Sequence, residues 1–251
     1  ASRRPADFIK RKLPSMYHQF KELAEIDITE EPMEVGPTLH YFMGGIRVDS
    51  DSQQTNVAGL FACGECAGGM HGANRLGGNS LSDLLVFGKL AGDGVIDYIN
   101  NLTGSLNCKS DNIGKIIKKA TDILNRNEGA NPYLVHESLQ CIMQDHVGIV
   151  RTGEELQVGL QKLDVIKSDI NNVFAHASAQ YNPGWNEALD LQNLIITAEA
   201  VTRAAILREE SRGAHTRLDF EGEREEGLEY NIIIKKSEKG MIAEKINRDT
   251  P

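Results

Sequence analysis

The stretch HGANRLGGNSLSD, residues 71–83, places a single arginine among small residues directly ahead of an apolar run. The planar guanidinium of Arg75 stays charged and can bond both oxygens of a carboxylate. Gly77 and Gly78 allow a flat ligand to approach the backbone closely. If a helix follows, its positive end also favours an anion. The stretch therefore indicates a site for an acidic ligand or a cofactor.

The sequence predicts that this helix begins after Asn79. Ser80 and Asp83 have the spacing of a capping box, and leucines at 81, 84 and 85 open the apolar face behind it. An ordinary capped core helix has the same signature. Gly88 and Gly92 weaken such a helix unless another backbone or a ring packs tightly against them.

The sequence lacks three other common binding and catalytic motifs. The chain has no GxGxxG dinucleotide fingerprint. Two glycine pairs, at 64 and 69 and at 72 and 77, have P-loop spacing, but no Lys-Ser or Lys-Thr follows them. A nucleophile elbow is also excluded, because Ser80 is followed by Leu81 and Ser82 instead of a nearby glycine.

The four cysteines do not make a zinc site. Cys63 and Cys66 form one CxxC, which is typical of a redox or metal pair, but Cys108 and Cys141 do not supply a second pair. We expect free thiols, buried or half-buried, in a reducing compartment. No metal ligand is assigned.

Two regions must position these residues. Residues 1–104 combine a helix interrupted at Pro14, strand-like runs such as TLHYFMGGIRVD and AGLFACGE, and the long helix after Asn79, which together suggest part of an α/β unit. Residues 107–227 show apolar residues at helical spacing and predict a helical bundle. The four stripes are Ile113, Ile116, Ile117, Ala120, Ile123 and Leu124; Val135, Leu139, Ile142 and Met143; Leu156, Leu160, Leu163 and Ile170; and Leu191, Leu194, Ile195, Ala198, Val201 and Ala205. The tail, 228–251, offers one strand, EYNIIIKK.

The overall charge limits the classes of partner that the chain is expected to bind. Acidic residues outnumber basic ones by 36 to 27, giving a net charge of −9, which disfavours a nucleic-acid surface. The apolar runs are too short to span a membrane, and no secretory signal is visible. The chain begins at Ala1 without Met, and we expect a processed product or an excised fragment.

Four motifs carry a family resemblance. PTLHYFMGGI, GLFACGE, HGANRLGGNSLSDLLVFG and SRGAHTRLDF resemble, in the same order, the flavoprotein subunit of succinate dehydrogenases and fumarate reductases. The resemblance runs from KLPSMY into the tail and so covers nearly the whole chain. L-aspartate oxidase is similar over the first three motifs.

The resemblance implies roles for five residues. Arg75 and His40 correspond to ligands of the substrate carboxylates. Glu65 corresponds to the ligand of the ribityl chain of FAD, and Ser80 and Leu81 to positions whose backbone meets the flavin ring. The helix that follows is then expected to point its positive end at the pyrimidine edge of the flavin.

The resemblance also implies what this chain lacks. Family members begin with a GxGxxG unit and carry an inserted capping domain, whose arginine moves the proton. We therefore expect the C-terminal part of an FAD-binding α/β domain, a helical bundle and a short tail, with no catalytic residue of its own. FAD is expected in the full-length subunit and not in this chain alone.

The expected reaction interconverts succinate and fumarate, with electrons exchanged through an iron–sulfur subunit. Membrane contact would come only through partner subunits, with this chain peripheral on the cytoplasmic, inner face of the cell membrane. The SRGAH motif, residues 211–215, is taken as structural, at a subunit contact for example. Two alternatives stay open: an L-aspartate oxidase-like enzyme, and a folding and docking module without activity.

Overall fold

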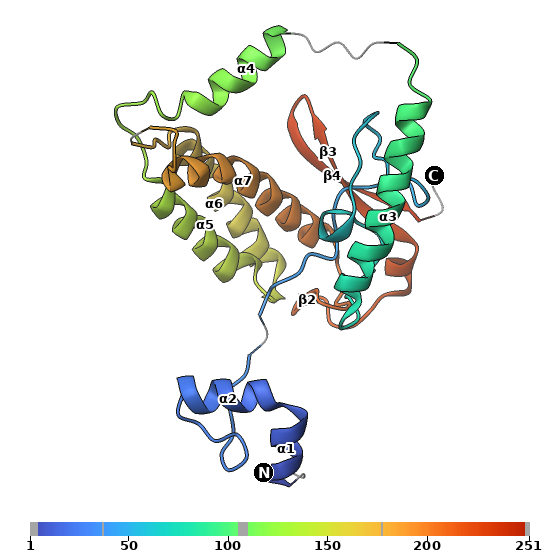
Figure 1. Ribbon diagram of the computed structural model, residues 1–251, viewed down its shortest axis with the longest axis vertical. Coiled ribbons are helices and arrows are strands. Elements are labelled where there is room, and N and C mark those ends of the chain that lie inside the picture. The colour runs from blue at the N-terminus through green and yellow to red at the C-terminus, as the bar shows by residue number, and fades with distance from the viewer. Residues whose placement is uncertain (1–4, 37, 105–109, 177, 249–251) are drawn as a thin grey trace. The chain divides into compact units, whose positions relative to one another are not determined.

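The computed structural model describes residues 5–36, 38–104, 110–176 and 178–248 (Figure 1). The chain divides into two compact units, Ala1–Tyr41 and Phe42–Pro251. Cys108 and Pro37, the first residue of the PTLHY motif, lie outside the described residues. The predicted domain boundaries near residues 104–107 and 227–228 stay predictions.

The first unit contains two short helices, α1 (Ala6–Lys12) and α2 (Pro14–Leu23). Pro14 occupies the first turn of α2, where its missing N–H costs nothing. The predicted interruption at Pro14 is therefore confirmed. Asp27 fastens the chain after α2, because its carboxylate accepts hydrogen bonds from Tyr17 and Thr29.

The second unit opens with turns, followed by the 3-10 helix η1 (Gly64–Cys66) and the long helix α3 (Asn79–Asn100). In the described part of 42–78, the strand-like runs pair only as isolated bridges, Ile46 with Ala67 and Gln54 with Phe61. This region supplies the α/β part of the fold, and α3 is its one long regular element.

The capping box predicted at the start of α3 is wrong. The helix begins at Asn79, and its N-cap is Gly78 in the left-handed conformation, with φ of 86° and no side-chain cap. Ser80 consequently lies inside the first turn. Asp83 is buried and forms an ion pair with His71, 3.5 Å away, so its side chain is engaged outside the helix.

Close packing on α3 occurs at a glycine other than those expected. Among the described residues, nothing lies within 4 Å of a Cβ built on Gly88 or Gly92. A Cβ on Gly94, by contrast, would lie 2.3 Å from the carbonyl oxygen of Ser52. Gly94 therefore lets α3 pack against the backbone of the turn at 49–54.

A helical bundle follows, as predicted. The helices of this region are α4 (Ser110–Thr121), α5 (Pro132–Val147), α6 (Gly153–Asn171) and α7 (Pro183–Leu207). The last three lie side by side (Figure 1) and bury their apolar stripes against one another. Side chains of Asn131, Thr152 and Asn182 cap their N-termini. Leu163, Ile170 and Leu191 are almost fully buried at the centre of this core.

The first predicted stripe joins the core only at its end. Ile113, Ile116 and Ile117 on α4 are 44%, 69% and 56% exposed, and α4 has no buried residue. Ile123, just beyond the helix, is buried in the core of α5–α7. Because those three helices cover one another's apolar faces, the α4 stripe stays outside the core, and the prediction that all four stripes pack in the bundle is wrong for α4.

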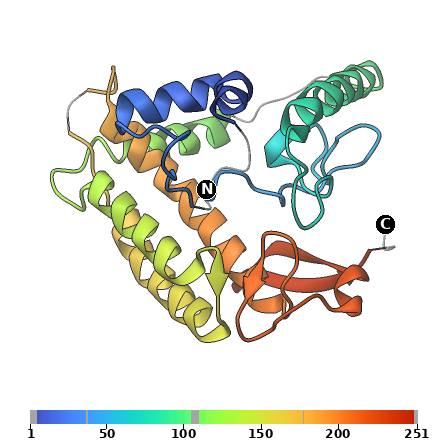
Figure 2. The same cartoon turned by 90° about the horizontal axis from the view of Figure 1, so that it is seen from below.

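Short strands complete the unit. β1 (Val150–Arg151) pairs in parallel with β2 (Thr216–Arg217), and a second 3-10 helix, η2, spans Glu225–Leu228. β3 (Tyr230–Ser237) and β4 (Gly240–Asn247) form an antiparallel hairpin. Figure 2 shows this hairpin beside the end of α7, against which both strands pack.

The predicted strand in the tail is confirmed as β3, whereas β4 was not predicted. β4 carries Glu244 and Lys245 between apolar residues, so its alternation is weak. Its partner strand and the turn at Gly240, with φ of 109°, make it a strand. Within the described ranges, none of the helices has the length and apolar character needed to cross a membrane.

Candidate functional site

The loop 71–78 carries Arg75 and leads directly into the N-terminus of α3. Arg75 is half-buried, and its Nη1 donates a hydrogen bond to the carbonyl oxygen of Leu76 at 3.3 Å. The beginning of the loop is held by the ion pair of His71 with Asp83, whose side chains are only 8% and 2% exposed. One cationic side chain is thus presented on a loop that is anchored to the helix behind it.

The start of α3 is open to a ligand. Among the described residues, nothing lies within 4 Å of a Cβ built on Gly77 or Gly78, and Leu81 is 69% exposed. Ser80 is half-buried in the first turn. With no side chain capping the helix, its positive end faces space that a flat anionic group can fill.

Glu65 lies on η1, which packs against α3. Gly64 has φ of 71°, in the left-handed region that favours glycine, and a Cβ there would lie 2.6 Å from Cδ2 of Leu84, so glycine suits this approach of η1 to the helix. The exposed carboxylate of Glu65 accepts a hydrogen bond from the backbone N–H of Phe42 at 2.9 Å. The fold therefore brings the turn that carries Glu65 to the helix that follows Arg75.

His40 belongs to the first unit, Ala1–Tyr41, and its side chain is exposed. The other four predicted site residues, Glu65, Arg75, Ser80 and Leu81, belong to the second unit and gather around the start of α3 and η1. The assignment of His40 to the substrate stays a prediction.

The CxxC does not form a bond within this site. Cys63, Cys66 and Cys141 are free thiols, and the Sγ of Cys66 donates to the carbonyl oxygen of Cys63 at 3.2 Å. Cys66 and Cys141 are exposed, contrary to the expectation of buried or half-buried thiols. The described part of the chain contains no cluster of His, Cys, Asp or Glu suited to a metal ion.

A buried charge network surrounds the SRGAH motif. Glu210 is only 1% exposed, and its carboxylate accepts hydrogen bonds from the guanidiniums of Arg208 and Arg212. Burial opposes ionisation of Glu210, but these bonds and one from the Arg224 amide outweigh it and lower its pKa to about 2. In the folded chain Glu210 is therefore ionised at neutral pH, in contact with these arginines.

A second ion pair fixes the chain just after this motif. Arg217 is buried, and its guanidinium binds the Asp219 carboxylate through two hydrogen bonds of 2.7 Å. The same guanidinium donates to the last turn of α7 at the carbonyl oxygen of Ala205. Hydrogen bonds from Arg217 hold the pKa of Asp219 well below its usual range, against the opposing effect of burial.

Sequence reasoning singled out SRGAH as a motif but missed these networks. Their members lie at irregular spacing over 205–224, so no periodic signal marks them. The only sign of these networks in the sequence is the high density of arginines and acidic residues around the motif.

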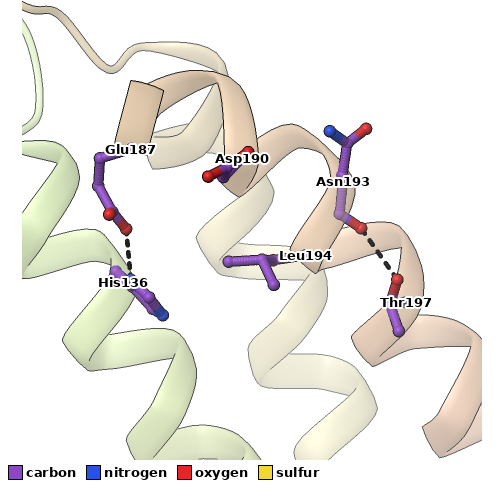
Figure 3. Close-up of a pocket in the computed structure, with 6 residues that line it drawn as sticks. All are labelled: His136, Glu187, Asp190, Asn193, Leu194 and Thr197. Carbon is purple, nitrogen blue, oxygen red and sulfur yellow. Dashed lines mark hydrogen bonds and ion pairs between the residues drawn. The ribbon is translucent and has the colours of Figure 1, made fainter. Parts of the chain in front are cut away.

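One open pocket lies outside all of the motifs. It has a volume of about 350 Å³ and lies on α5 and α7, where it is lined by His136, Glu187, Asp190, Asn193, Leu194 and Thr197 (Figure 3). Nδ1 of His136 pairs with the Glu187 carboxylate across the two helices. None of the predicted site residues lines it, so it is separate from the region around Arg75.

Two family models match the chain. An FAD binding domain matches residues 1–81, and a fumarate reductase flavoprotein C-terminal domain matches residues 136–246. The first match contains the loop of Arg75 and the start of α3, whereas the second contains most of the bundle and nearly all of the hairpin.

Individual proteins agree with these matches. An uncharacterized FAD-dependent oxidoreductase of Methanocaldococcus jannaschii is 40% identical over 92% of this chain and 41% of its own length. The fumarate reductase flavoprotein subunit of Escherichia coli is 34% identical over 84% of this chain and 35% of its own length. A chain of the Mycobacterium smegmatis Sdh1 complex superposes with a TM-score of 0.90 at 44% identity, covering 100% of this chain and 43% of that one.

This chain spans less than half the length of those proteins. The order of its motifs, the two matching domains and the superposition lead to the same assignment. The chain belongs to the family of succinate dehydrogenase and fumarate reductase flavoprotein subunits.

Proposed function

We propose that this chain is the C-terminal portion of a flavoprotein that interconverts succinate and fumarate by hydride transfer to or from FAD. The observation that carries the proposal is the junction at residues 75–81. There an arginine loop runs into the open, uncapped N-terminus of a 22-residue helix. A dicarboxylate and an anionic cofactor both need positive charge at their binding site, although the chain as a whole carries a net charge of −9. The junction supplies that positive charge through Arg75 and the N-terminus of α3.

The residues around α3 fit a flavin. Gly77 and Gly78 leave space above the helix start, and Leu81 offers an exposed apolar side chain there. Glu65 presents an exposed carboxylate that can accept hydrogen bonds from the hydroxyls of a ribityl chain. When bound, a flavin would supply the hydride acceptor or donor, and the N-terminus of α3 would stabilise negative charge that develops on it.

Arg75 binds one carboxylate of the dicarboxylate in this proposal, and His40 binds a second substrate oxygen. Arg75 orients the substrate because its fork restrains rotation of a carboxylate. No residue of this chain is assigned the proton transfer, which we place on an arginine of a capping domain in the full-length subunit.

Electrons leave, in this proposal, through an iron–sulfur partner subunit. The chain would be peripheral on the cytoplasmic, inner face of the cell membrane, in contact with the membrane only through partner subunits. Two observations support this arrangement: the related Sdh1 chain is part of a complex, and none of the described helices is suited to span a membrane.

The test uses the purified full-length subunit and the 251-residue chain side by side. We expect succinate to bleach the flavin spectrum of the full-length protein, and L-aspartate to leave it unchanged. Bleaching by aspartate alone would favour the oxidase alternative. The 251-residue chain should be colourless and inactive with succinate and an artificial acceptor. A stoichiometric flavin spectrum from it would contradict the expectation that this chain alone does not hold FAD.

A further inference from the structure

The SRGAH motif forms a tight turn whose backbone bonds run both ways. The N–H of Arg212 donates to the carbonyl oxygen of His215 at 2.9 Å, and the N–H of His215 donates back at 3.0 Å. Between them Gly213 has φ of 59°, in the left-handed region that favours glycine. We call residues 211–215 the SRGAH turn.

The SRGAH turn touches the loop that carries Arg75. The N–H of Ala214 donates a hydrogen bond to the carbonyl oxygen of Ala73 at 3.1 Å. A Cβ built on Gly213 would lie 2.3 Å from that oxygen and 2.5 Å from the carbonyl carbon of Ala73. The contact is therefore backbone against backbone, and neither side can move away by changing a rotamer.

The loop is held on its other side by α3. His71 pairs with the buried Asp83 of the helix, whereas Ala73 rests on the SRGAH turn. Arg75 follows two residues after Ala73. The position of the guanidinium thus depends on two supports, of which one comes from the far end of the chain.

The SRGAH turn is itself rigidly mounted. Arg212 binds the buried carboxylate of Glu210 through Nε and Nη2, at 3.1–3.2 Å. Nε2 of His215 lies 3.0 Å from the carbonyl oxygen of Arg208, and Nδ1 lies 2.8 Å from Nη1 of Arg151. These polar and charged side chains are buried or half-buried, so displacing the turn would leave several of them without their partners.

We propose that Gly213 and Ala214 are positioning residues for dicarboxylate binding, acting through Ala73 on the loop that presents Arg75. The proposal rests on the proposed function of Arg75. A carboxylate fork requires its donors in one plane, and a displacement of about 1 Å at a reacting site can cost about 100-fold in rate. The contacts that hold the SRGAH turn in place would supply that precision, and they come from residues outside the FAD-binding region.

The test compares Gly213→Ala with Gly222→Ala in the full-length flavoprotein. Gly222 also has a left-handed backbone, with φ of 79°, and its carbonyl oxygen accepts a bond from the Ser211 amide. Among the described residues, however, nothing lies within 4 Å of a Cβ built there. Both variants introduce similar backbone strain next to the same turn, and only Gly213→Ala collides with Ala73.

The measured quantity is the Kd of malonate, an unreactive dicarboxylate, obtained from the change in the flavin spectrum when malonate binds. We expect Gly213→Ala to raise the malonate Kd and the KM for succinate by about 10- to 100-fold relative to Gly222→Ala. Flavin content should be similar in the two variants. Gly213→Ala should be the less stable of the two, because it adds the collision with Ala73 to a similar backbone strain, so binding is measured well below the unfolding temperature of both. Equal malonate Kd values in the two variants would overturn the proposal.

A second variant covers the case in which Gly213→Ala does not fold. Ala73 is exposed, so Ala73→Gly is tolerated by packing, but it loosens the loop at the point of contact. It should raise the malonate Kd without loss of flavin, and an unchanged Kd would count against the proposal. If wild type and Arg75→Lys bind malonate equally, the function assigned to Arg75 fails first, which is a different outcome from failure of the turn alone.

Discussion

Nη1 of Arg151 lies 2.8 Å from Nδ1 of His215, beside the parallel pairing of β1 with β2. A guanidinium can only donate, so Nδ1 must accept, and the ring proton is placed on Nε2, which faces the carbonyl oxygen of Arg208. The neutral imidazole satisfies both partners. A second proton would have to be placed on Nδ1, against the guanidinium.

This arrangement predicts a pH-dependent stability. Burial lowers the pKa of His215, the bond to Arg208 partly opposes that effect, and the charge of Arg151 adds to it. Below about pH 6.5, where an unfolded histidine takes up its proton, the unfolded state binds more protons than the folded one. The free energy of unfolding should therefore fall as the pH falls from about 6.5 towards 5.

The measurement is urea unfolding of wild type and His215→Gln between pH 7.5 and pH 5. A glutamine amide can donate to the carbonyl and accept from Arg151, but it does not titrate. The decline in this window should be smaller in His215→Gln, and parallel curves for the two proteins would contradict the prediction.

Glu210 should stabilise the fold as an anion. Its folded-state pKa of about 2 lies below the ordinary value of 4.5, so its contribution is complete above about pH 4.5 and is lost as the pH falls towards 2. Glu210→Gln keeps the shape but loses the charge that three arginine residues contact. Its unfolding free energy should be clearly lower than that of wild type at pH 7, with the gap narrowing between pH 5 and pH 3. A constant gap over this range would indicate that packing, and not charge, accounts for the loss.

Two glycines of α3 should respond oppositely to alanine. Gly94→Ala would bring a Cβ to 2.3 Å from the Ser52 carbonyl oxygen, and we expect a loss of about 1–3 kcal/mol from overpacking. Gly92→Ala meets open space in the described structure, and alanine is favoured over glycine in a helix by about 0.8–1 kcal/mol. Thermal unfolding of the two variants gives the comparison, and a stabilising Gly94→Ala would show that α3 does not pack on the turn at 49–54.

Arg75→Lys tests the substrate assignment in the full-length subunit. The change keeps the charge and removes the fork, and one charge-assisted hydrogen bond contributes about 1.5–3 kcal/mol. Since about 1.36 kcal/mol corresponds to tenfold in rate, kcat/KM for succinate should fall by about one to two decades. Flavin content should stay constant, because Glu65 and the start of α3 are assigned to the cofactor. Joint loss of flavin, stability and activity would instead indicate that Arg75 only supports the fold.

The sequence by itself determined the elements that depend on short-range pattern. The interruption at Pro14, the apolar stripes of α5, α6 and α7, and β3 all follow from spacing and local propensity, and the structure confirms them. The motifs likewise indicated the family, which the comparisons confirm. The roles of Arg75 and Glu65 came from the same motifs and stay predictions.

Tertiary structure decided the features that depend on residues far apart in the chain. Asp83 had the spacing to cap α3, but its carboxylate pairs with His71, and Gly78 begins the helix instead. The contact of the SRGAH turn with the loop of Arg75, where Gly213 meets Ala73, likewise joins residues far apart in the sequence. Local spacing indicates which conformation a segment favours. It does not indicate which distant part of the backbone will lie about 3 Å away, because burial and pairing are decided only when the whole chain packs.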